Sequence, residues 1–468
     1  AFTNLAAYPI NLIAWKIHDQ AISLENILPL HLCDIAAFIA GLALLVYLTI
    51  RGVELLIAAP LCALFVAATS GIAPFPSMAP ADAPAFTSAY MGGFVGFIQT
   101  WFFMFLLGSL FGKVMEASGA ADSVASWIVN RTGAKHAPLA VVLACAVLTY
   151  GGVSLFVVAF SVFPMALSLF KVANLPRRFI PAALAFGSVT FTMTSAGSPE
   201  IQNWIPIKFL GTTPYAAAET SLLVAVSMAI GGYLWLRTMI RRAVASGETF
   251  EARAGDPSAS EKRDLPALWR GGVPLLVVLL VSFVWHDSLK ESALILALGL
   301  GVIAAILLHL PQLKGRYGDA ATGGALGALI AIANTAAVVG FGSVAKLTPG
   351  FQAAVDTMTS LPGEPLIGAA IAVSVIAGLT GSASGGQSIA LPLIAPHYLD
   401  LGVDPEGLHR VVSISSGALD SLPHNGYVVT TLRGICKETY AAAYPAVGAL
   451  TVVVPALGTA FAVMLLSL

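Results

Sequence analysis

Charged residues are the side chains that this sequence has least of. Asp, Glu, Lys and Arg make up 10% of its 468 residues, whereas 57% are hydrophobic. Soluble proteins carry about 25% charged residues, so the composition excludes a soluble protein. The net charge of −1 provides no basic surface for a polyanion, so no nucleic-acid partner is expected. Apolar stretches recur instead, each near the roughly 20 residues that a spanning helix needs, and they indicate an all-α polytopic membrane protein.

Motifs for metals, redox chemistry and nucleotides are also missing. The four cysteines lack metal or redox spacing, so we interpret Cys33, Cys62, Cys145 and Cys436 as packing residues. The glycine-rich stretches lack the phosphate-loop pattern, GxxxxGK followed by Ser or Thr, so no ATP hydrolysis is expected. We therefore expect neither a metal nor a cofactor. The expected location is a bacterial inner membrane, which the chain crosses many times.

Glycine (44 residues) and proline (27) are abundant and interrupt the apolar stretches. Four interruptions stand out: 150–154 (YGGVS), 195–203 (SAGSPEIQN), 380–387 (TGSASGGQ) and 421–426 (SLPHNG). Backbone that breaks at membrane depth is tolerated only where protein or a water-filled cavity satisfies it. Discontinuous helices of this kind form substrate sites in secondary transporters. The interruptions therefore predict a transport site.

Two of the interrupted stretches, 137–170 and 364–397, predict re-entrant hairpins. Basic residues flank the first stretch on both sides, which places both of its ends in the cytoplasm: Arg131, Lys135, Lys171, Arg177 and Arg178. Two full crossings would satisfy these charges equally well. Each arm has only about 14–16 residues, which is short for ~30 Å of hydrocarbon and favours the hairpin.

The interruptions recur in the same order in both halves of the chain. Gly152 and Ser382 are 230 residues apart, and Pro199 and Pro423 are 224 residues apart. An odd number of crossings in each half would invert the second half. We therefore predict two inverted-topology repeats, 41–240 and 271–468, each with five spans, a re-entrant hairpin and a discontinuous helix. The hydrophilic stretch 241–270 is predicted to be a cytoplasmic linker.

Three motifs at these interruptions resemble a known family: 198–206 (SPEIQNWIP), 381–386 (GSASGG) and 419–426 (LDSLPHNG). They are similar to those of the gluconate permease (GntP-type) organic anion:proton symporters, within the ion-transporter superfamily. The resemblance implies import of gluconate-like sugar acids, or of hydroxy acids such as hydroxybutyrate, with protons. It begins near Gly41, so residues 1–40 are interpreted as an atypical N-terminal leader.

Polar residues at the interruptions are the candidates for substrate binding. An organic anion must exchange its hydration for fixed donors, and half-helix N-termini provide backbone N–H groups for it. The predicted substrate-binding residues are Ser154, Ser198, Gln202, Asn203, Ser382, Ser384, Ser421, His424 and Asn425. The alternative for each serine is close helix packing.

Three ionisable residues at the interruptions are candidates for proton coupling. His424 carries an imidazole whose ordinary pKa lies near 6.5, and it could hold and release a coupling proton. Glu200 is its counterpart in the first half, where the alternative role is a helix-cap charge near water. Asp420 could pair with a base or relay protons.

The sequence thus predicts a secondary carrier that imports a small organic anion by proton symport, not an enzyme. A sodium-coupled carboxylate or citrate-type carrier of the same superfamily is the main alternative. A passive channel and an intramembrane Ser–His enzyme are further alternatives. The expected partners are the anion, its coupling ion and the lipid bilayer, together with a second copy of the chain in a homodimer.

Overall fold

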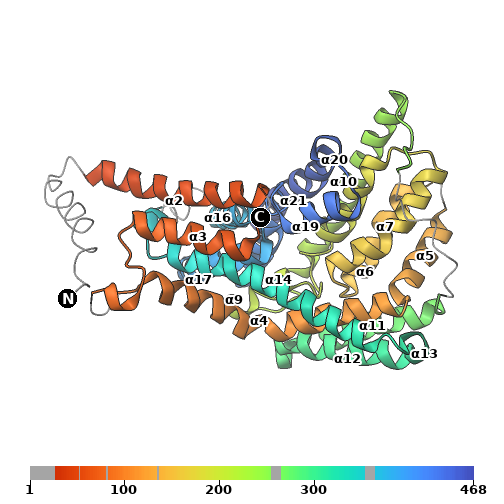
Figure 1. Ribbon diagram of the computed structural model, residues 1–468, viewed down its shortest axis with the longest axis horizontal. Helices are drawn as coiled ribbons and strands as arrows, with labels where there is room; N and C mark the ends of the chain where they lie inside the picture. The colour runs from red at the N-terminus through yellow and green to blue at the C-terminus, as the bar shows by residue number, and fades with distance from the viewer. Residues whose placement is uncertain (1–26, 52, 81–82, 134–135, 254–264, 354–363) are drawn as a thin grey trace, which may run out of the picture.

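The computed structural model describes residues 27–51, 53–80, 83–133, 136–253, 265–353 and 364–468. Within these ranges the chain forms 19 α-helices and no β-strand (Figure 1). Six described helical segments are long and apolar enough to cross a membrane: α4 (Phe86–Ala117), α7 (Leu155–Val172), α10 (Ala218–Ala245), α11 (Leu268–Leu289), α14 (Tyr317–Ala345) and the last segment, Tyr440–Leu466. The protein is therefore an all-helical, multi-span membrane protein, as predicted.

The remaining helices complete the two halves. In the first half they are α2 (Ile27–Ile50), α3 (Leu55–Thr69), α5 (Ala120–Thr132), α6 (Ala137–Tyr150), α8 (Ile180–Ala185) and α9 (Ile207–Leu210). In the second half they are α12 (Ser292–Leu308), α13 (Leu310–Leu313), α16 (Pro365–Thr380), α17 (Ala383–Asp400), α18 (Pro405–Ser416), α19 (Gly426–Val429), α20 (Tyr440–Gly448) and α21 (Val454–Leu466).

Helices extend into both the predicted leader (1–40) and the predicted linker (241–270). Residues 1–26 of the leader lie outside the described residues, whereas residues 27–40 belong to α2, which continues to Ile50. The predicted linker overlaps the end of α10 and the start of α11, and its residues 254–264 lie outside the described part of the chain.

Two helical pairs occupy the stretches predicted to be hairpins. Helix α6 has 14 residues, as predicted for one arm, but α7 has 18 and is long enough to cross. Helices α16 and α17 have 16 and 18 residues. Each pair turns at a glycine in the left-handed region, Gly152 with φ of 90° and Gly381 with φ of 61°. Glycine reaches this conformation without steric cost, which explains the glycines at both tips.

The two stretches predicted to be discontinuous crossings are interrupted where the sequence predicts. The first passes from α8 through a π-helical turn (Phe186–Thr190) into non-helical backbone and resumes at Ile201. The second leaves α18 at Ser416 and resumes at Gly426, where α19 begins. Gly and Pro residues lie in both gaps, and neither residue type favours a helix interior.

These two interrupted stretches run in opposite directions. At the start of the first, Arg177 Nε lies 2.9 Å from Glu438 Oε1, just beyond the end of the second. At the other end, Thr212 Oγ1 lies 2.6 Å from His409 Nδ1, near the start of the second stretch. The start of each stretch therefore contacts the end of the other.

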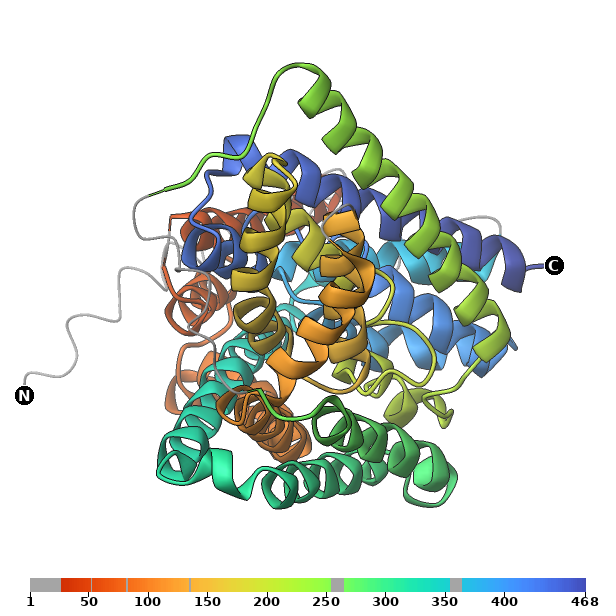
Figure 2. The same ribbon diagram turned by 90° about the vertical axis from the view of Figure 1, so that its right-hand side faces the viewer.

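Long helices form one side of the molecule and pack through glycine. Figures 1 and 2 place α4 beside α14, with α11 and α12 along the same side. A Cβ on Gly324 of α14 would lie 2.7 Å from Leu110 Cδ2 of α4, so only glycine allows this approach. A hydrogen bond from the Tyr90 hydroxyl to the Ala337 carbonyl, 3.1 Å long, also joins the two helices.

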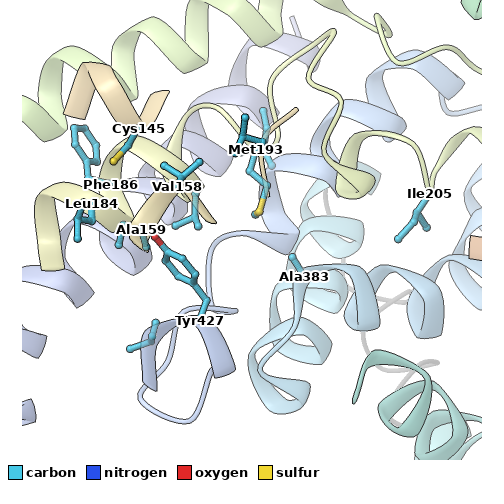
Figure 3. Packing of buried hydrophobic residues seen from close by; sticks show 14 of the residues in the cluster. Cys145, Val158, Ala159, Leu184, Phe186, Met193, Ile205, Ala383 and Tyr427 are labelled. Atoms are coloured by element: carbon cyan, nitrogen blue, oxygen red, sulfur yellow. The ribbon is translucent and has the colours of Figure 1, made fainter. Parts of the chain in front are cut away.

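The first hairpin packs against the second half. Figure 3 shows the ring of Tyr427, from α19, pointing toward Val158 and Ala159 of α7. The same ring lies edge-on to Phe156, with 5.7 Å between the ring centres. Cys62, Cys145 and Cys436 are buried free thiols, which confirms them as packing residues. The side chain of Cys33 lies outside the described part of the structure.

Candidate substrate cavity

A cavity of about 510 Å³ lies where both hairpin tips meet the breaks of the two interrupted stretches, called below the first interruption (191–203) and the second interruption (417–425). Eight of the eleven residues predicted for the site line it: Ser154, Glu200, Gln202, Ser382, Ser384, Asp420, Ser421 and Asn425. They come from four segments that are far apart in the sequence. Side chains of α4, α7, α12 and α14 complete the lining, so the scaffold helices also contribute to this space.

Helix N-termini face the cavity at both hairpin tips. Ser154 and Ser382 are the N-cap residues of α7 and α17, and both line the cavity. Ser382 Oγ accepts a 3.1 Å hydrogen bond from Gly385 N and lies 3.3 Å from Ser384 Oγ. Ser154 makes no such capping bond. A helix N-terminus carries a partial positive charge, so both tips favour a carboxylate.

Asn425 joins the second interruption to the second hairpin. Its Oδ1 caps α19 by accepting a 3.0 Å hydrogen bond from Val428 N. Its Nδ2 donates to the Gly381 carbonyl at the hairpin tip, also at 3.0 Å. One side chain therefore fixes both the start of α19 and the position of the tip.

The acidic end of the second interruption is held from α20. The Ser421 hydroxyl donates a 2.9 Å hydrogen bond to Asp420 Oδ1. Two tyrosines one helical turn apart hold the backbone, because the Tyr440 hydroxyl donates to the Pro423 carbonyl and the Tyr444 hydroxyl to the Ser421 carbonyl. Asp420 is thus presented to the cavity by a loop whose backbone is anchored.

The first interruption contacts the second hairpin through two glutamines. Gln387 Nε2, on α17, donates a 3.0 Å hydrogen bond to the Gln202 carbonyl. Gln202 Oε1 is buried and has no hydrogen-bond partner among the described residues. Because an unsatisfied buried acceptor is costly, this oxygen is a candidate contact for a substrate hydroxyl or a cation.

Ser198, Asn203 and His424 do not line the cavity. Asn203 Nδ2 donates to the carbonyls of Ser198 and Pro214, so its amide holds the first interruption in shape. His424 is 4% exposed and lies behind the second hairpin tip, where a Cβ on Gly381 would be 2.7 Å from its Cδ2. Their direct roles in binding and coupling stay predictions.

Several residues near the cavity were not among those predicted from the sequence. Arg410, on α18, is fully buried and donates to Asn203 Oδ1 and to the carbonyls of Thr194, Pro214 and Ala216. An arginine inside a membrane segment is a signal in itself, since such residues are rare and functional by default.

Four polar residues on α4 and α14 also line the cavity: Ser109, Lys113, Asn334 and Thr335. They lie in apolar spans without any break, so no interruption marks them, and Lys113 lies near a span end where a lysine usually extends to the headgroups.

Fold and cavity define the class of the protein, a helical multi-span membrane protein with a cavity between two interrupted helical stretches. A family model described as citrate transporter (CitMHS) matches residues 34–385, and the chain belongs to this family. The family is part of the predicted ion-transporter superfamily, although the matching model is not that of the gluconate permeases. The protein is therefore a transporter and not an enzyme, as predicted.

Two curated relatives and one solved structure are similar to the chain. A Bacillus subtilis protein, the uncharacterized transporter YxjC, is 36% identical over 465 residues, which cover 90% of this chain and 96% of that one. An uncharacterized transporter of Haemophilus influenzae is 25% identical over 358 residues, which cover 75% of this chain and 81% of that one. The crystal structure of the Alcanivorax borkumensis YdaH transporter shares the fold, with a TM-score of 0.52, 16% identity and coverage of 93% and 97%.

Proposed function

We propose that the protein is a secondary carrier of a small citrate-type carboxylate, driven by protons that enter with the substrate. The observation that carries the proposal is the cavity formed jointly by the two hairpin tips and the two interruptions. The citrate transporter family favours a citrate-type substrate over gluconate or hydroxybutyrate, which remain the competing candidates.

Substrate binding is proposed to use the donors at the two tips and the second interruption. The N-termini of α7 and α17 and the hydroxyls of Ser154, Ser382 and Ser384 would hold carboxylate oxygens. Asn425 and Gln202 present amides to the same space. Fixed donors of this kind replace the hydration that the anion loses when it enters the membrane.

Coupling is proposed to use the two acidic residues of the cavity. Glu200 and Asp420 line it from opposite halves of the chain. Ionised together, they would repel an anionic substrate, because like charges at close range interact strongly away from bulk water. Proton uptake by these carboxylates removes the repulsion and links anion entry to proton entry. Sodium ions could neutralise the same groups, so the experiment below includes both ions.

The architecture is proposed to be two inverted repeats, 41–240 and 271–468, with re-entrant hairpins and alternating access. Support comes from the opposite directions of the discontinuous crossings. The re-entrant form of the first hairpin is supported by its tip, where the Tyr150 hydroxyl donates to the Ala196 carbonyl in the middle of the first discontinuous crossing. We further propose a homodimer in a bacterial inner membrane, with residues 241–270 on the cytoplasmic side.

Uptake into proteoliposomes tests the proposal. Purified protein is reconstituted, and uptake of labelled citrate, gluconate and hydroxybutyrate is measured with an inward proton gradient, an inward sodium gradient or neither. We expect saturable citrate uptake that the proton gradient accelerates. Stimulation by sodium alone would assign the coupling to sodium. A preference for gluconate would favour the sugar-acid substrate that the sequence predicts. Failure to take up any carboxylate would overturn the proposed substrate class.

A further inference from the structure

Lys113 places a positive charge at the cavity, beside the first hairpin tip. Lys113 is the only Lys or Arg among the described residues that line the cavity. The carboxylic acids of this lining are Glu200 and Asp420. Its neighbour Gly112 packs against the tip, because a Cβ there would lie 3.5 Å from Ser154 Cβ. The lysine stem extends over α14, where a Cβ on Gly323 would be 3.7 Å from Lys113 Cδ.

A second residue on the same helix face holds the ammonium group. Lys113 Nζ lies 2.8 Å from Glu116 Oε2, one helical turn along α4, and the two side chains are 34% and 37% exposed. Glu116 does not line the cavity. An ion pair this exposed is weak, so a carboxylate in the cavity can compete with Glu116 for the lysine.

We infer that Lys113 is a specificity-determining residue, which binds an outlying carboxylate of the substrate and so selects polycarboxylates over monocarboxylates. The inference rests on the proposed function. One carboxylate can be held by the helix N-termini at the hairpin tips, whereas each additional carboxylate needs a separate donor. The two carboxylic acids of the lining, Glu200 and Asp420, provide no positive charge, so Lys113 is the cationic group available among the described lining residues. Glu116 is the competitor that sets how tightly Lys113 binds.

Competition against labelled citrate uptake tests this role. Inhibition constants are measured for unlabelled citrate, succinate and gluconate, which carry three, two and one carboxylates. For Lys113→Gln we expect the citrate constant to rise about tenfold or more, as the loss of a charged hydrogen bond implies, while the gluconate constant changes little. Lys113→Arg should keep most of the citrate affinity. Glu116→Gln frees the lysine and should lower the citrate constant, so the test remains decisive if Lys113→Gln folds poorly.

The matched control is Lys171→Gln, which removes an exposed lysine at the end of α7 without touching the cavity. It should leave all three constants unchanged. The inference is overturned if Lys113→Gln shifts the three constants by the same factor, or shifts none of them, while wild-type protein takes up citrate. If wild-type protein takes up no carboxylate, the proposed function has failed instead, and the two failures are distinguished by that measurement alone.

Discussion

Arg410 donates a 2.9 Å hydrogen bond through Nη1 to Oδ1 of Asn203, which lies 207 residues earlier in the chain. The same guanidinium donates to the carbonyls of Thr194, Pro214 and Ala216, and the arginine is fully buried. All four acceptors belong to the first interruption or the loop after it, whereas Arg410 lies on α18. One side chain of the second half therefore holds the discontinuous backbone of the first.

Arg410→Met should destabilise the protein strongly. The substitution leaves buried carbonyls without a donor, at a cost of about 1–3 kcal/mol for each group. Arg410→Lys should have an intermediate effect, because an ammonium group cannot reproduce the planar fork that reaches several acceptors. Thermal unfolding in detergent measures both. Arg242→Met, at an exposed position near the end of α10, is the control and should unfold like the wild type. Equal melting temperatures for Arg410→Met and wild type would contradict the assigned role.

Asn203 and Asn425 should respond differently to alanine, although the sequence predicts a substrate contact for both. Asn425 lines the cavity, and Asn425→Ala should raise KM for citrate because it removes a donor and releases the Gly381 tip. It should also cost about 1 kcal/mol through the lost cap of α19. Asn203 is engaged by Arg410 and by two backbone carbonyls, so Asn203→Ala should lower stability with KM near the wild-type value. Uptake kinetics and melting curves of both variants decide, and an equal rise in KM would favour the sequence-based prediction.

The general architecture follows from the sequence because the membrane restricts the alternatives. Without water to satisfy the backbone, apolar stretches must be helical, and a Gly- or Pro-rich break must face protein or a cavity. The breaks near Gly152, Pro199, Gly381 and Pro423 could therefore be located from residue types alone. Their shared order in the two halves brings them to one site, which is why most of the predicted residues line one cavity.

The remaining features depend on packing between segments that are distant in sequence. Asn203 and Asn425 occupy similar local contexts in the sequence. Only the fold brings Arg410 into hydrogen-bond contact with Asn203, which therefore does not line the cavity. Lys113 lies in the last turns of an uninterrupted helix, where snorkelling to the headgroups is the usual interpretation. Its place at the cavity follows from how α4 packs against the first hairpin, and the sequence of α4 alone does not determine that packing.

Gly381→Ala should lower stability, because the added methyl group would clash with the His424 ring. It should also weaken transport, because Gly381 lines the cavity. The residue has φ of 61°, and an added Cβ would lie 2.7 Å from His424 Cδ2. The left-handed backbone alone costs an alanine about 1–2 kcal/mol. The control is Gly402→Ala, where φ is 79° and nothing lies within 4 Å of the new Cβ, so only the backbone cost applies.

A double-mutant cycle with His424→Ala isolates the contact. The second substitution removes the imidazole that the new methyl group meets, so the double variant should recover part of the stability that Gly381→Ala loses. Additive melting-temperature changes would mean that the two residues do not interact.

Stability should depend on pH through Glu248, which lies three residues after the end of α10. Its carboxylate accepts two hydrogen bonds from Arg178, at 2.7 and 2.8 Å, and these lower its pKa below the ordinary value of 4.5. A lowered pKa in the folded state stabilises the protein above the unfolded pKa, and that contribution is lost as the pH falls through the folded pKa. The pair is partly exposed, so the effect should be about 1 kcal/mol or less. Melting temperatures of wild type and Glu248→Gln should differ at pH 7 and converge below pH 4.5; a constant difference would contradict this.

Glu200→Gln and Asp420→Asn should separate substrate exchange from proton coupling. Each substitution makes one cavity carboxylate permanently neutral, so anion entry no longer requires proton uptake at that position. We expect each single variant to lose part of the acceleration by an inward proton gradient, while exchange of internal for external citrate, which moves no net proton, continues. Asp287→Asn is the control, because Asp287 is 79% exposed and remote from the lining, and it should keep gradient-driven uptake. If both cavity variants respond to the proton gradient as the wild type does, these carboxylates do not carry the coupling ion.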